Sequence, residues 1–184
     1  LSPLMSVVVD LDLEETHDSL FDTLGACVAI PPSSDPMRRW LRLAGLLQTM
    51  AANATPGSHM RQPKGAALLR QAAEVARTMD RLLVEGIDPA ALMSSELLGV
   101  LGEQARHWGE STATFLTVQN GWLDHLESRV EVDASARRNL LFDAAARRWK
   151  ESPPAHPIVA AGVTSASPAL ARLLRVVCEL PQGA

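Results

Sequence analysis

The chain is poor in cysteine and has no long apolar run. It holds two cysteines in 184 residues, Cys27 and Cys178, which lie far apart in the sequence among apolar neighbours. Such neighbours favour buried thiols in a reducing compartment over a disulfide. No uninterrupted apolar stretch approaches the ~20 residues that span a bilayer, and the start lacks the basic and apolar pattern of a secretory signal. We therefore expect a cytoplasmic protein with no membrane partner.

The familiar catalytic and cofactor motifs are also missing. No G-x-x-x-x-G-K-[ST] segment is present to cradle the phosphates of ATP. The five histidines show no i,i+4 pair and no nearby cysteine or carboxylate at ligand spacing, which disfavours a zinc site. Asp10 and Asp12, followed by Glu14, could hold a divalent cation, but a solvated acidic loop is the simpler interpretation. We expect no catalytic residue, metal or cofactor here.

The net charge of -4 is the sum of two unlike parts. Residues 1–35 hold seven acidic residues and no lysine or arginine, whereas residues 36–184 hold all 17 basic residues and the other 14 acidic ones. The body of the chain is therefore mildly basic. Its overall acidity does not exclude nucleic acid as a partner.

Helical periodicity dominates the middle of the chain. Apolar residues recur at three- and four-residue spacing over 37–54 and 64–85. A longer helix is expected after Gly102, and Asp133 is expected to cap another that runs to about Trp149. Three aromatic residues recur every seven positions in the longer helix: Trp108, Phe115 and Trp122. This spacing is typical of core packing, and base stacking on an exposed platform is the alternative.

Short apolar runs predict one strand near each end. The β-branched run 7–9 enters the acidic loop, and 158–161 has the composition of a buried parallel strand. Ser167 before Pro168 predicts the N-cap of a last helix. Because the chain supplies few neighbours for either strand, we expect it to be an internal piece of a larger protein.

The predicted fold is mainly α, with a helical bundle-like insertion over 35–154. Partial α/β segments at 1–34 and 155–184 flank it, each with one strand. The loop before the last helix offers backbone N–H groups at a helix start, which can bind a phosphate. The candidate residues of this loop are Thr164, Ser165 and Ser167.

Two segments near the end resemble the AddB family. The first is Val132-Asp-Ala-Ser-Ala-Arg-Arg-Asn-Leu-Leu-Phe-Asp-Ala-Ala-Ala-Arg-Arg-Trp149, and the second is Pro153-Pro154-x-x-Pro157-Ile-Val-Ala-Ala-Gly162. The resemblance spans most of the chain and is most specific over 132–184. One loop differs: the family usually has Ser-Thr-Gly-Ser after the glycine, where this chain has Val163-Thr-Ser-Ala166.

AddB is the second subunit of the bacterial AddAB helicase-nuclease, and the resemblance is to the alphaproteobacterial type. It implies part of the amino-terminal helicase-like region, which is similar in architecture to superfamily 1 helicases but is generally not the motor. The family's nuclease domain and iron-sulfur cluster lie downstream of this region. The intact complex is an ATP-dependent helicase and exonuclease that resects double-strand breaks for recombination.

The resemblance implies a non-catalytic, DNA-holding role, with double-stranded or forked DNA, the AddA subunit and the remainder of AddB as partners. Cations that neutralise phosphates provide most nonspecific affinity for DNA, so basic residues are the candidate contacts. The candidates are Arg38, Arg39, Arg42, Arg61, Lys64, Arg137, Arg138, Arg147 and Arg148. The alternative is a protein-interaction module that docks AddA, since paired arginines also suit protein interfaces.

Overall fold

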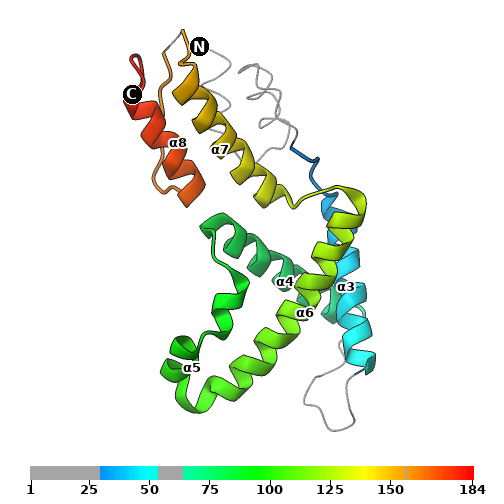
Figure 1. Ribbon diagram of the computed structural model, residues 1–184. Helices are drawn as coiled ribbons and strands as arrows, with labels where there is room; N and C mark the ends of the chain where they lie inside the picture. Colours follow the sequence, from blue (N-terminus) through cyan, green and yellow to red (C-terminus); the bar gives the residue numbers. More distant parts are fainter. Residues whose placement is uncertain (1–29, 54–63, 156) are drawn as a thin grey trace. The chain divides into compact units, whose positions relative to one another are not determined.

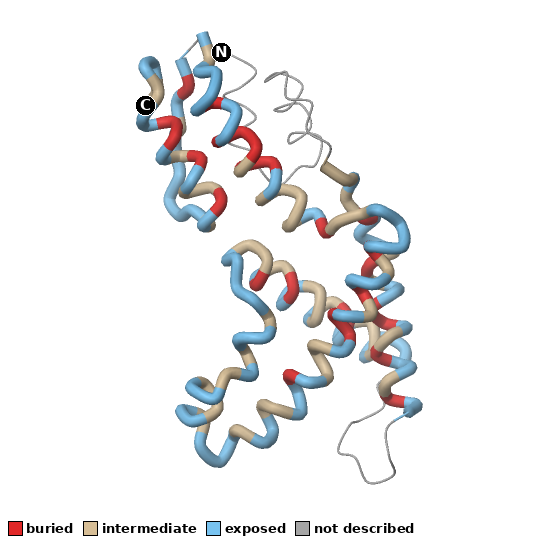
Figure 2. Tube along the Cα trace, in the orientation of Figure 1, coloured by how far each residue is buried: buried red, intermediate tan, exposed pale blue. Residues whose placement is uncertain are grey.

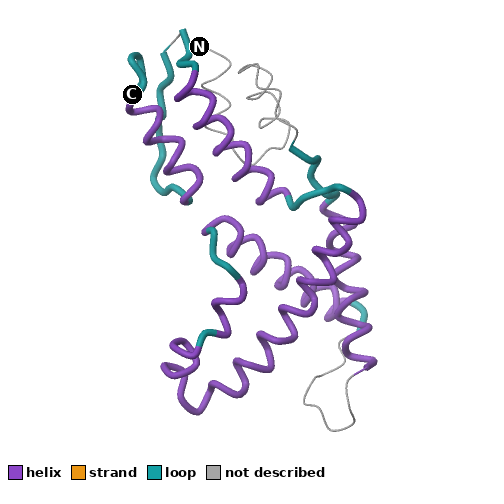
Figure 3. The backbone as a smooth tube through the Cα atoms, viewed as in Figure 1, coloured by secondary structure: helices purple, strands orange, loops and turns teal. Residues whose placement is uncertain are grey.

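The computed structural model describes residues 30–53, 64–155 and 157–184, and these residues are mainly helical (Figures 1 and 3). The predicted mainly α class is confirmed. The chain divides into two compact units. We call residues 33–83 and 87–132 the helical unit. The other, whose described part is 30–32, 84–86 and 133–184, we call the carboxy-terminal unit.

The helices follow the predicted pattern closely. In chain order they are α3 (Pro36–Asn53), α4 (Ala66–Glu85), the 3-10 helix η1 (Pro89–Met93), α5 (Ser95–Leu101), the 3-10 turn η2 (Gly102–Gln104), α6 (Ala105–Arg129), α7 (Ala134–Glu151) and α8 (Pro168–Glu179). None of these described helices combines the length and the apolar composition that a membrane-spanning helix needs.

The core of the helical unit is shared by α3, α4 and α6. Figure 2 shows buried positions recurring along these helices, as expected of amphipathic helices around one core. The buried members are Leu43, Ala44, Leu47, Ala72, Met79, Val118, Trp122 and Leu126. Gly121 of α6 allows the Leu46 side chain of α3 to pack closely against it. A Cβ built on Gly121 would lie 2.9 Å from Leu46 Cδ2.

Two of the three aromatic residues of α6 lie in or against the core, so the core interpretation is confirmed for Phe115 and Trp122. Trp122 is fully buried, and Phe115 packs against the same cluster. Trp108 is half-buried, and its indole N–H donates to the Leu92 carbonyl oxygen at 2.9 Å. Trp108 therefore holds η1 against α6 instead of forming a stacking platform.

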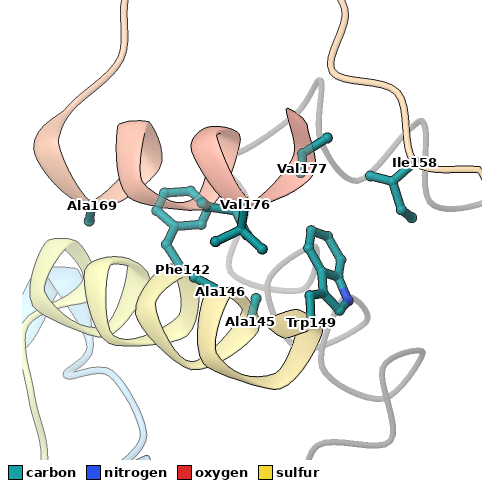
Figure 4. Close-up of a cluster of buried hydrophobic side chains, with 9 residues drawn as sticks. Phe142, Ala145, Ala146, Trp149, Ile158, Ala169, Val176 and Val177 are labelled. Atoms are coloured by element: carbon teal, nitrogen blue, oxygen red, sulfur yellow. The ribbon is translucent and has the colours of Figure 1, made fainter. Parts of the chain in front are cut away.

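The carboxy-terminal unit is built on the packing of α7 against α8. Figure 4 shows side chains of this core, with Phe142 and Trp149 of α7 directed toward α8 and Val176 of α8 beside Phe142. Val177 of α8 belongs to the same cluster. The remaining buried members are Ala145, Ala146, Ile158, Ala169 and Leu173. The contacts thus group α7 with α8, whereas the predicted limits placed α7 in the helical domain 35–154. Those limits, with 1–34 and 155–184, stay a prediction.

Residues 158–161 do not form the predicted strand. Within the described residues, β structure is limited to two isolated bridges, Ser33 with Val132 and Ile158 with Gly183. The second bridge is short because the partner of Ile158 is the turn after α8, where Ile158 N–H donates to Gln182 and its carbonyl accepts from Ala184. The run 7–9 lies outside the described residues, so the amino-terminal strand stays a prediction.

The expectation of a buried thiol is wrong for Cys178, which is free and exposed. The buried face of α8 contains Leu173, Val176 and Val177, and the next residue lies about 100° further around the helix. Apolar neighbours in sequence therefore do not place this side chain in the core. Cys27 lies outside the described residues.

Candidate nucleic-acid interface

The start of α3 and the end of α6 lie side by side. Ser33 forms a parallel bridge with Val132, and the Ser34 N–H donates to the Val132 carbonyl oxygen at 2.8 Å. The Asp35 carboxylate accepts from the Arg38 backbone N–H at 2.7 Å, which satisfies one of the free donors at the start of α3. Side chains from the first turns of α3 and the last turn of α6 consequently meet.

Three arginines lie at this junction: Arg38 and Arg129 contact the carboxylate of Glu131, and the charge of Arg42 acts on His125. We call Arg38, Arg42, Arg129, His125 and Glu131 the arginine cluster. Its centre is the Glu131 carboxylate, whose two oxygens accept from Arg38 Nη1 at 2.8 and 3.0 Å. Arg129 Nε donates to the same carboxylate at 3.3 Å. The hydrogen bond from Arg38 is the largest influence that lowers the pKa of Glu131, so this residue stays ionised near pH 7.

The pKa of His125 is affected by all three arginines of the cluster. Its ring stacks on Trp122, with the ring centroids 5.4 Å apart. Burial is the largest influence that lowers its pKa, and the positive charges of Arg42, Arg129 and Arg38 lower it further. His125 is therefore neutral at pH 7. The cluster then contains three guanidinium groups against one carboxylate, and Asp35, whose carboxylate accepts from the Arg38 N–H, reduces the local surplus to one positive charge.

The surplus charge is accessible from solvent. Arg42 is exposed and makes no hydrogen bond or ion pair with any residue that the structure describes. The side chains of Arg38 and Arg129 are 33% and 47% exposed, although both contact Glu131. A planar guanidinium can form paired hydrogen bonds with phosphate oxygens, so the cluster can hold an anion of that kind.

Arg39 differs from its neighbour Arg38. Its side chain is buried, with Nη1 donating to Asp80 Oδ1 at 2.7 Å and Nη2 to the Ala76 carbonyl oxygen at 3.4 Å. Its guanidinium carbon lies 6.0 Å from the Trp122 ring centroid, in cation–π range. Arg39 thus joins α3 to α4 and the core, and we do not carry it forward as a DNA contact.

The other predicted contacts are scattered. Arg61 lies outside the described residues, and Lys64 is exposed just before α4. Arg147 and Arg148 are exposed near the end of α7, where the helix dipole also stabilises positive charges. Arg137 and Arg138 are half-buried, and Arg137 Nε donates to the Pro31 carbonyl oxygen at 3.2 Å. The structure therefore brings Arg38 and Arg42 together with residues that the sequence did not indicate.

The predicted phosphate loop has the expected helix start and little else that defines a site. Thr164 and Ser165 are exposed, whereas Ser167 is half-buried directly before Pro168 of α8. The Ser167 carbonyl accepts from Ala171 N–H at 2.8 Å, but its side chain makes no capping hydrogen bond. Phosphate binding there stays a prediction. Among the described residues no group of histidine, cysteine and carboxylate side chains could hold a metal ion, and Asp10 and Asp12 lie outside them.

Charge is unevenly distributed within the helical unit. Residues 33–83 contain eight lysine and arginine residues, Arg61 included, and three carboxylates. Residues 87–132 contain two basic residues and seven carboxylates. The unit is therefore neutral as a whole, with +5 in its first half and -5 in its second. A polyanion would favour the α3 and α4 part of the unit.

Val130, which directly precedes Glu131, ends α6 in a strained backbone conformation. Val130 follows α6 in the left-handed conformation, with φ 54° and ψ 43°. The Val130 N–H donates to the Glu127 carbonyl oxygen, and the Glu131 N–H donates to the Leu126 carbonyl oxygen. This is the hydrogen-bond pattern of a Schellman motif. Glycine normally occupies this position, because a β-branched residue is disfavoured at positive φ.

Replacing Val130 by glycine is expected to stabilise the helical unit by about 1 kcal/mol, since it removes left-handed strain at an exposed position. Thermal unfolding followed by circular dichroism measures the change. Val130→Ala is the matched control, because alanine keeps the Cβ that causes the strain. A lower melting temperature for Val130→Gly than for the unchanged chain would contradict the prediction.

Comparison with family models, with curated proteins and with solved structures finds no match to this chain.

Proposed function

We propose that the chain holds the sugar-phosphate backbone of DNA as a non-catalytic part of an AddB-like helicase-nuclease subunit acting in double-strand break repair. The proposal includes the prediction that residues 1–34 and 155–184 are parts of a helicase-like α/β domain. The observation that carries it is the arginine cluster, where three guanidinium groups from α3 and α6 outnumber one carboxylate. The resemblance of 132–184 to AddB supplies the cellular setting.

Three features favour a phosphate backbone as the ligand. The exposed residues of the cluster are Arg42 and Arg129, and guanidinium groups donate to phosphate oxygens without reading base sequence. Glu131 holds Arg38 in place before any ligand arrives, so less side-chain entropy is lost on binding. The cluster also lies at the ends of helices from a shared core, which gives it a rigid support.

Reversing two charges of the cluster is expected to weaken DNA binding about 100-fold at low salt, because each lost phosphate contact costs about tenfold. The variant is Arg42→Glu with Arg129→Glu. The measurement is a fluorescence-anisotropy titration against blunt and forked duplexes at several salt concentrations. The slope of log affinity against log salt should become shallower by about two.

Arg106→Glu is the matched control, since Arg106 is an exposed arginine of α6 in the acidic half of the unit. Circular dichroism establishes that the variants remain folded. The proposal fails if the unchanged chain does not bind either duplex at low salt. It also fails if the cluster variant binds as tightly as Arg106→Glu.

Docking of the AddA subunit is the second candidate, and two exposed apolar residues favour it. Met37 and Leu41, one turn apart on α3, are each 56% exposed beside Arg42. Such residues can anchor a protein partner. An apolar docking surface would bind AddA with little dependence on salt, whereas phosphate contacts predict a steep dependence.

A further inference from the structure

The exposed face of α4 contains a row of arginines that the cluster does not include. Arg70, Arg77 and Arg81 are separated by seven and four residues, so on a helix they project within about 40° of one line. All three are exposed. The core-facing residues of α4 are Ala72, Met79 and Leu82, which lie on other sides of the helix.

Most of this charge is available to a ligand. Arg70 and Arg81 make no hydrogen bond or ion pair with any described residue. Arg77 pairs with Glu74 on the same face, and Glu85 lies one turn beyond Arg81. Lys64, two residues before α4, is exposed as well.

The neighbouring side chains distinguish between kinds of partner. Ala66, Ala67, Gln71 and Thr78 are also exposed along this face, and each is small or polar. Protein interfaces usually bury aromatic or large apolar residues at their centres, and this row has none. A polyanion needs only the cations.

The length of the row matches several phosphates of one strand. Eleven residues at 1.5 Å per residue place Arg70 and Arg81 about 16 Å apart along α4. Neighbouring phosphates of one B-form strand lie further apart than the axial rise of about 3.4 Å, because the strand winds around the axis, so the row spans only a few phosphates. Long arginine side chains can adjust to the local position of each phosphate.

We propose that this face of α4, with Lys64, is a second and linear contact for the DNA backbone, along which one strand lies. The inference rests on the proposed function and deepens it. The arginine cluster grips the backbone at one place, whereas the α4 row extends the contact over a longer stretch of nucleic acid.

The test compares three variants. The first carries both Arg70→Glu and Arg81→Glu, the second is the cluster variant that carries both Arg42→Glu and Arg129→Glu, and the third is the Arg106→Glu control. Each full chain is titrated against a duplex of about 20 base pairs at several salt concentrations. We expect the α4 variant to lose about 100-fold in affinity at low salt, with a salt slope shallower by about two. The neutral pair Arg70→Gln and Arg81→Gln should lose less, because it removes attraction without adding repulsion.

The outcomes separate the two proposals. If the cluster variant binds weakly while the α4 variant matches Arg106→Glu, the α4 inference is overturned and the proposed function stands. If the unchanged chain does not bind the duplex, both are overturned. Arg70 and Arg81 are exposed and make no hydrogen bond or ion pair with described residues, so the charge reversals should leave the melting temperature nearly unchanged. An unchanged melting temperature would exclude unfolding as the cause of a lower DNA affinity.

Discussion

Replacing Trp122 by alanine is expected to lower the free energy of unfolding of the helical unit by about 4 kcal/mol. The side chain is 0% exposed and lies in the cluster that joins α3, α4 and α6. Its ring also stacks on His125 and lies below the Arg39 guanidinium. A cavity of that size cannot be refilled without moving three helices. Since domains are stable by only about 5–15 kcal/mol, a large part of the margin is lost.

Amide hydrogen exchange and urea denaturation measure this effect. The matched variant is Trp149→Ala, which removes an equally buried tryptophan from the core between α7 and α8. Because each unit has its own core, Trp122→Ala should reduce protection mainly in α3, α4 and α6. Equal loss of protection in α7 and α8 would show that the two cores unfold together.

Replacing Gly183 by alanine is expected to open the turn after α8 and to cost about 2–3 kcal/mol, the sum of several net hydrogen bonds and some burial. A Cβ at Gly183 would lie 1.7 Å from the Val177 carbonyl oxygen, which is backbone and cannot rotate away. Moving the turn would break the bonds that Ala184 makes to Ile158 and Ala160, at 3.0 and 2.7 Å. Ile158, now 4% exposed, would lose part of its burial.

The exchange rates of the Ile158 and Ala160 amides measure this opening directly. Gly162→Ala is the control, because that glycine has φ 74° but nothing within 4 Å of an added Cβ. It should therefore cause only the local backbone strain, of about 1 kcal/mol. Equal effects of the two variants on Ile158 exchange would argue against the steric explanation.

Local structure was predictable because its causes are local. The predicted helices 37–54 and 64–85 begin and end within two residues of α3 and α4, since apolar spacing, prolines and glycines act over a few positions. The helix after Asp133 was also predicted within two residues of its observed end. The strand predicted at 158–161 is reduced to one isolated bridge at Ile158, because strands depend on partners elsewhere in the chain.

The arginine cluster shows where sequence patterns stop being informative. Arg38 and Glu131 are separated by 93 residues, and no local pattern indicates that α3 begins where α6 ends. The burial of Arg39 did have a signal: it lies four residues before Leu43, which is itself four before Leu47, so all three share one face of α3. Arg38 and Arg39 are equivalent as a basic pair in the sequence, and the helical register of α3 distinguishes them.

The opposite charges of the two halves of the helical unit have a consequence for kinetics. To the extent that the +5 and -5 parts of the chain also lie apart in space, the neutral unit has an electric dipole, and the field of a nearby polyanion exerts a torque on it. The unit would rotate during approach so that α3 and α4 lead. Added salt should then slow association more than it speeds dissociation, although the net charge of the unit gives no hint of such steering.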